Sequence, residues 1–139
     1  MNRWLFGAGL LDAAASLLHL GCIVGGPAWY RFFGAGNRIV RMAERDWWRP
    51  APVTLLIAAV LAVWAAYAFS GAGVLPRLPL LKLGLGVIAA IYLLRAAAVP
   101  WMLTAMPDRT PTFLWVSSAI VLVFGLVHLV GLIFLIRAD

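Results

Sequence analysis

Four long apolar stretches dominate this chain of 139 residues and constrain its fold most strongly. A helix of about 20 mostly apolar residues crosses the roughly 30 Å hydrocarbon core of a bilayer. The chain is 65% hydrophobic and only 12% charged, outside the range of ordinary soluble domains. We therefore expect an all-α, polytopic membrane protein with four transmembrane helices. The four expected spans are Trp4 to Gly25, Ala51 to Gly71, Leu78 to Val99 and Thr112 to Ile136.

Glycine and proline residues separate the four stretches cleanly. The first stretch ends at Gly25-Gly26-Pro27, and the connection between the second and third is too short to cross anything. The second and third helices should therefore form a tight hairpin. No internal repeat is visible in the sequence, so we expect a single domain over residues 1–139, folded as an up-down four-helix bundle.

The connection between the first and second stretches has a helical pattern of its own, NRIVRMAERDWW over residues 37–48. Its apolar side chains fall on one stripe and its arginines on another, as in an amphipathic helix that lies in the membrane interface. Anionic lipid headgroups would be the natural partner of the basic stripe, although the arginines could serve only to set the topology. The residues expected to meet lipid headgroups are Arg38, Arg41, Arg45 and Arg49.

The distribution of Lys and Arg predicts the orientation of the chain in the membrane. The formal net charge is +6, and most of the arginines lie in the first and third connections. Positive residues remain on the cytoplasmic side of bacterial membranes, so these two connections should be cytoplasmic and both termini periplasmic. The same rule accounts for the positive charge without a nucleic-acid partner, and we expect none.

Charged and titratable residues inside the spans are candidates for a functional site, because they are costly in hydrocarbon and usually face the bundle interior. On the first helix Asp12 and His19 are seven positions apart, on one face, and on the fourth helix Ser117 and His128 are eleven apart, also on one face. The remaining candidates are Lys82, Arg95 and Tyr67.

Depth sorts these candidates into two layers. Antiparallel first and fourth helices place residues at one depth when their numbers sum to about 139, and Asp12 with His128 gives about 140. The expected outer layer contains these two residues, with Lys82 and Tyr67 as further candidates. The expected inner layer contains His19, Arg95 and Ser117.

The residue types in the outer layer indicate what chemistry it could perform. A carboxylate beside an imidazole in a medium of low dielectric can share or relay a proton, and the alternative is that Asp12 and His128 only satisfy each other and fix how the helices pack. We expect no metal, because the two histidines lie at different depths and the single cysteine, Cys22, forms no metal-binding pair. No cofactor is expected, and no catalytic residue can be assigned.

One region resembles a known type of protein. The run from Ser16 to Gly34, SLLHLGCIVGGPAWYRFFG, together with the later Tyr92-Leu-Leu-Arg95, resembles small uncharacterised bacterial four-helix membrane proteins and is distantly similar in layout to DoxX-like proteins. The resemblance implies a four-helix bundle in a bacterial inner membrane and implies no activity.

Three functions fit these features. The first is a membrane protein that binds or passes a small amphipathic molecule, or protons, through a polar-lined bundle cavity. The second is a membrane enzyme that acts on a lipid-soluble substrate such as a quinone or an isoprenoid, with a histidine as acid or base. The third is an accessory subunit of a larger membrane complex. The expected partners are the bilayer and its anionic lipids, a small apolar ligand, and either further copies of the chain or a larger complex.

The orientation can be tested with reporter fusions. A reporter fused after Asp139 should be found in the periplasm, and a reporter inserted near Asn37 should be found in the cytoplasm. The reason is that the arginine-rich connections stay on the cytoplasmic side. The opposite labelling would show that the arginine count does not set the topology of this chain.

Overall fold

The computed structural model of the chain describes residues 1–139 and contains helices, turns and no strand, as the sequence predicted. Three helices, α1, α4 and α7, are each long and apolar enough to cross a membrane, and α5 with α6 makes a fourth such segment if the two count as one span. The helices are α1 Arg3–Gly25, α2 Pro27–Phe32, α3 Asn37–Arg45, α4 Ala51–Ala72, α5 Leu81–Ala97, α6 Val99–Ala105 and α7 Pro111–Ala138.

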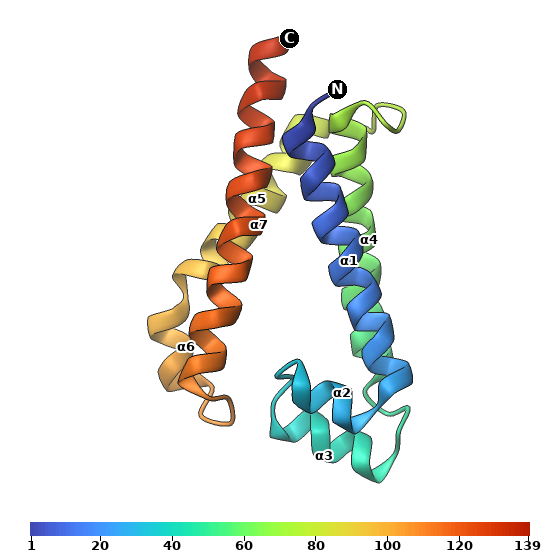
Figure 1. Cartoon of the computed structure of the whole chain (residues 1–139), viewed down its shortest axis with the longest axis vertical. Helices are drawn as coiled ribbons and strands as arrows, with labels where there is room; N and C mark the ends of the chain where they lie inside the picture. Colours follow the sequence, from blue (N-terminus) through green and yellow to red (C-terminus); the bar gives the residue numbers. More distant parts are fainter.

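The long helices form two antiparallel pairs. Helix α1 packs along α4, and α5 packs along α7, while α1 also contacts α7 and α4 contacts α5. Both termini lie at the end where the two pairs meet, which we call the terminal end; from there the pairs diverge toward the opposite end, the α3 end, where α2 and α3 lie below α1 and α4 (Figure 1). The bundle is therefore closed at the terminal end and splayed below it.

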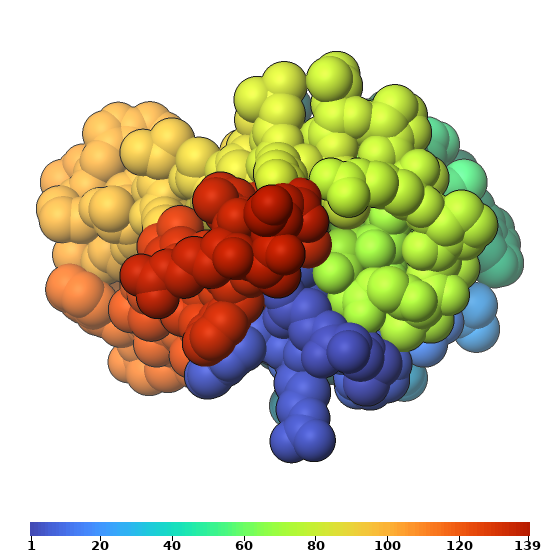
Figure 2. Space-filling view, turned by 90° about the horizontal axis from the view of Figure 1, so that it is seen from above, coloured from blue at the N-terminus to red at the C-terminus, as the bar shows by residue number.

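Close apolar packing joins the two pairs at the terminal end. A Cβ atom on Gly131 of α7 would lie 2.6 Å from the side chain of Leu5, so only glycine lets the two helices approach this closely. Asn2 caps α1 and also donates a hydrogen bond of 2.8 Å to the carbonyl of Gly131. Figure 2, viewed onto this end, shows the last residues of the chain against the first residues and the α4–α5 connection. The core here contains Leu5, Ala72, Leu81, Leu85 and Leu132.

The predicted amphipathic helix is present as α3, but it ends at Arg45 and not at Trp48. Its apolar face packs on α2, in a core cluster of Tyr30, Val40 and Ala43 that extends to Cys22 of α1. The short helix α2, which the sequence analysis did not identify, follows Gly26 at φ +69° and has Pro27 in its first turn. This packing fixes the direction in which the arginines of α3 project.

The third span differs from the prediction of one continuous helix over residues 78–99. Helix α5 begins at Leu81 and ends at Ala97, and α6 continues after a bend of 58°. Pro100 lies in the first turn of α6, where its missing N–H is tolerated, but its ring disfavours a continuous helix through the residues before it. The chain therefore turns at Ala98.

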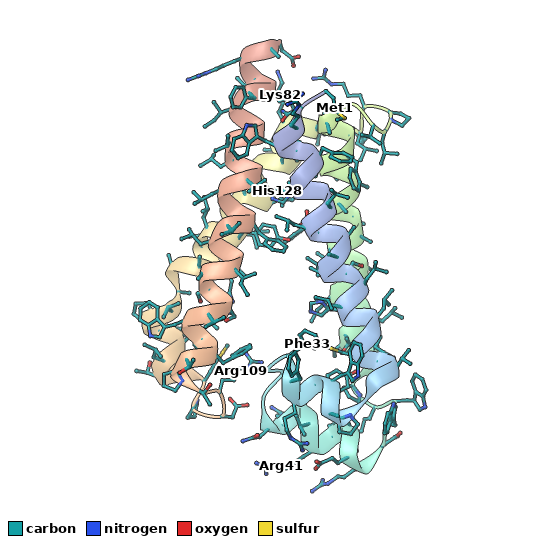
Figure 3. All side chains as sticks on the ribbon, viewed as in Figure 1. Met1, Phe33, Arg41, Lys82, Arg109 and His128 are labelled. Carbon is teal, nitrogen blue, oxygen red and sulfur yellow. The ribbon has the colours of Figure 1, made fainter.

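The two pairs approach each other again at the α3 end, through turns and not through helices. Arg109, before α7, donates a hydrogen bond of 2.9 Å to the carbonyl of Ala35 in the α2–α3 turn. A Cβ on Gly34 would lie 2.1 Å from the ring of Phe113, so this contact is also tight. Figure 3 labels Arg109 and Phe33 on the two sides of this junction, below the separation between the pairs.

Candidate functional site

Three polar side chains meet where the two helix pairs join. Nε2 of His128 on α7 lies 2.9 Å from Oδ2 of Asp12 on α1, and the hydroxyl of Tyr92 on α5 donates to Oδ1 of Asp12 at 2.6 Å. The side chains of Asp12 and His128 are both fully buried. Figure 3 labels His128 at this meeting point. Three different helices thus contribute one group each to a single buried cluster.

The hydrogen bonds determine where protons can reside in this cluster. Nδ1 of His128 lies 2.8 Å from the carbonyl of Phe124, and because a carbonyl only accepts, Nδ1 must carry a proton. The bond between Nε2 and Asp12 then contains one further proton, which belongs either to the imidazole, giving an ion pair, or to the carboxyl, giving a neutral pair. The cluster can therefore hold the same proton in two ways without any change in its hydrogen-bonded partners.

Aromatic rings surround the cluster. The ring of Trp64 on α4 contacts the ring of Tyr92 edge-on, with centroids 5.0 Å apart. The ring centroids of Phe124 and His128 lie 5.4 Å and 5.3 Å from the centroid of Tyr92. Gly125 lets α7 come close to the backbone side of Tyr92. All four long helices thus contribute to the cluster or to the rings around it, and a buried polar group without a partner would be costly here.

The structure confirms the contact between Asp12 and His128 that the sequence predicted. It also adds Tyr92, which was not among the candidate residues. The expected spans that begin at Trp4 and Leu78 are offset by 74 positions, whereas Tyr92 lies 80 positions beyond Asp12. A helical side chain leans toward the start of its helix, so the long Tyr92 side chain reaches back toward the terminal end and covers part of this difference.

Lys82 and Tyr67, the further candidates for the outer layer, lie toward the terminal end and do not join the hydrogen bonds of the Asp12 cluster. Lys82 forms an ion pair with Asp139 at the terminal end, where Arg77 also binds the same carboxylate. The hydrogen bonds from these two cations, Lys82 first, lower the pKa of the Asp139 side chain. Tyr67 donates to the carbonyl of Pro79. Tyr67 thus finds its partner in the α4–α5 turn, and Lys82 finds its partner at the end of α7.

The expected inner layer forms only in part. Arg95 on α5 donates to Ser118 at 2.8 Å and to Ser117 at 3.2 Å, both on α7, so its predicted partner Ser117 is confirmed and Ser118 is new. His19 does not join them. Its Nδ1 is bonded to the carbonyl of Ala15 in its own helix, and Nε2 forms no hydrogen bond. Residues at one depth need not touch here, because the two pairs diverge below the Asp12 cluster (Figure 1).

His19 and Ser117 nevertheless point toward the separation between the pairs. Side chains seven residues apart on a helix point in directions that differ by only about 20°. His19 therefore projects from α1 in nearly the same direction as Asp12, toward α7. Side chains eleven residues apart also point in nearly the same direction, so Ser117 projects from α7 as His128 does, toward α1. Arg95 is bonded to Ser117 and therefore lies on this side of its own pair. No carboxylate lies within ion-pair distance of it.

The basic residues expected to meet lipid lie together at the α3 end. Arg38, Arg41 and Arg45 project from the exposed face of α3 and Arg49 follows in the next turn, and none of the four is paired with a carboxylate. No three side chains among His, Cys, Asp and Glu converge in a way that could hold a metal ion. Comparison of the chain with family models, with curated proteins and with solved structures finds no match. The resemblance to DoxX-like proteins thus stays a prediction.

The contact between Asp12 and His128 can be measured with a double-mutant cycle in bicelles. Asp12→Leu and His128→Leu each leave the other polar group buried without its main partner, so the double variant should be less destabilised than the sum of the single variants. We expect a coupling energy of about 1–2 kcal/mol, at the upper end of the values for hydrogen bonds between membrane helices.

A matched cycle provides the control. Thr54 on α4 is buried and bonded to Tyr30, away from the cluster, so Thr54→Val combined with His128→Leu should give simply additive losses. If the cycle with Asp12 were additive as well, the two side chains would not interact in the membrane.

Proposed function

We propose that this chain is a four-span protein of a bacterial inner membrane, with both termini in the periplasm, that binds a small amphipathic molecule between its two helix pairs. Four long apolar helical segments support the spans, and the arginine-rich connections support the orientation. The placement of both termini at one end of the molecule is consistent with an even number of spans (Figure 1).

Arg95 carries the proposal for a ligand. It is a cation in an apolar helix whose only partners are two serine hydroxyls. A guanidinium that merely reached for the membrane surface would extend toward the end of its helix, whereas this one is held against α7 and the chain continues as α6 beyond it. A charge within a span usually has a counter-charge or a water-filled surrounding. An anionic group of a ligand would supply the counter-charge.

The remaining groups on this side suit an amphipathic molecule. A layer of apolar and aromatic side chains, Ala15, Trp64, Val121 and Phe124, packs around Tyr92 and lies between Arg95 and the terminal end. An apolar portion of the ligand would contact this layer, and a polar head would meet Arg95 and the free Nε2 of His19. Such a molecule could arrive from the lipid, because the two helix pairs diverge from each other there (Figure 1).

The Asp12 cluster would link ligand binding to a proton. It lies at the closed end of the separation, and its two protonation arrangements, ion pair and neutral pair, differ in charge distribution directly behind the aromatic layer. A ligand that stabilises one of these protonation arrangements would also bind more tightly when the cluster adopts it, because coupling between two sites is reciprocal. The cluster is fully buried, so it would exchange its proton only when the two pairs move apart.

Mass spectrometry of solvent extracts tests the proposal. The purified chain should carry a small amphipathic species that is reduced about tenfold or more in Arg95→Gln, the loss expected when a charge-assisted bond to a ligand is removed. Arg95→Lys should retain part of it. Arg137→Gln, which removes an exposed arginine at the terminal end, should retain all of it. Extracts that are identical for all four proteins would refute a site at Arg95, provided that circular dichroism shows the variants to be folded.

A further inference from the structure

A hollow lies at the α3 end, remote from the Asp12 cluster. It has a volume of about 550 Å³ and is formed by α3, the residues after it and the turn between α6 and α7. It is lined by Asn37, Arg38, Arg41, Met42, Arg45, Arg49, Pro107 and Asp108. Figure 3 labels Arg41 on the side of α3 that faces away from the helix pairs. The volume falls in the range of small-molecule sites and exceeds what one monatomic ion needs.

The charge of this hollow is strongly unbalanced. Four arginines and one aspartate line it. The only ion pair near α3 joins Glu44 to Arg31 and involves none of them. Arg38, Arg41 and Arg45 follow one another at intervals of three and four along one face of α3, where like charges repel. The arginines would be stabilised by an anion that is itself multiply charged.

The guanidinium groups of these arginines are suited to binding phosphate. Guanidinium groups present planar pairs of N–H donors that match the oxygens of a phosphate and form short, charge-assisted hydrogen bonds with it. The opposite face of α3 is fixed by its packing on α2, in the core cluster that contains Tyr30, so the arginines project from a packed helix and not from a mobile loop. We propose that this hollow is a discrete site for a polyanionic phosphate group, carried by a lipid headgroup or by a soluble compound.

The position of the hollow suits a lipid headgroup. Trp47 and Trp48 follow α3 directly and are both exposed, as are aromatic residues at a membrane interface. Because the apolar ends of α1 and α4 lie just above, the arginines are at the level where headgroup phosphates would lie. A soluble phosphate would reach the same side chains from the aqueous side.

An anion in this site would also connect the two halves of the molecule. Arg38, Arg41 and Arg45 belong to α3, below the α1/α4 pair, whereas Pro107 and Asp108 precede α7 of the other pair. The backbone contact beside them is tight, since a Cβ on Gly36, at φ +94°, would lie 2.4 Å from the Asp108 carboxylate. Occupancy of the hollow would therefore act on the junction that closes the α3 end. This inference does not depend on a ligand between the helix pairs.

Native mass spectrometry of the full chain in detergent micelles tests the site. Dioleoyl phosphatidic acid, whose phosphomonoester approaches two charges, should bind more tightly than the singly charged phosphatidylglycerol, and phosphatidylcholine should bind least. The double variant R41Q/R45Q should weaken phosphatidic acid binding by about tenfold or more. The double variant R3Q/R137Q removes the same charge from exposed positions at the terminal end and should leave binding unchanged.

A further variant should strengthen binding. Asp108 is exposed and contributes the only negative charge to the hollow, so Asp108→Asn should raise the affinity for phosphatidic acid severalfold. Equal losses in the two arginine double variants, equal binding of the three lipids, or no gain in Asp108→Asn would each overturn a discrete site.

Inorganic pyrophosphate distinguishes the two sources of phosphate. Titrated by calorimetry in the same detergent without added lipid, it should bind the native chain and not R41Q/R45Q if the site takes a soluble compound. If phosphatidic acid binds and pyrophosphate does not, the site takes a lipid headgroup. If neither one binds, the proposal is wrong, and because the variants leave Arg95 intact, that result would not affect the ligand proposed between the helix pairs.

Discussion

The hydrogen bond between Asp12 and His128 is the interaction on which the rest of this structure depends. Both side chains are fully buried among apolar and aromatic residues, where a carboxylate or an imidazolium alone would be very unfavourable. Each side chain therefore needs the other as its partner, and their contact holds α1 against α7. Tyr92 adds α5 to the same contact through Asp12.

This dependence explains why the molecule is closed at one end and splayed at the other. At the terminal end, Gly131 lets α7 approach Leu5 closely, and the polar cluster lies at the inner limit of that packing. Below the cluster the polar side chains find partners within their own helix or pair, as Ser16 does with the carbonyl of Ala58 and Arg95 with two serines. Nothing there draws the pairs together until the turns at Ala35 and Arg109 meet.

Much of the fold could be predicted from the sequence, because apolar length and helical periodicity are local properties. The long helices, the amphipathic α3 and the contact between Asp12 and His128 all follow from spacing and depth. The contribution of Tyr92, the position of His19 and the bend at Ala98 did not follow. These features depend on the length of a side chain, on the angle between helix axes and on the backbone geometry before Pro100. Counting residues along parallel helix axes gives none of the three.

Nitrogen NMR of the imidazole rings tests the hydrogen bond between Asp12 and His128 most directly. The chain has only two histidines, so selective ¹⁵N labelling with His19→Gln leaves the signals of His128 alone. The account predicts a protonated Nδ1, held by the carbonyl of Phe124, and an Nε2 signal that shifts when Asp12 is replaced by Asn. An unprotonated Nδ1, or an Nε2 signal unchanged by Asp12→Asn, would contradict it.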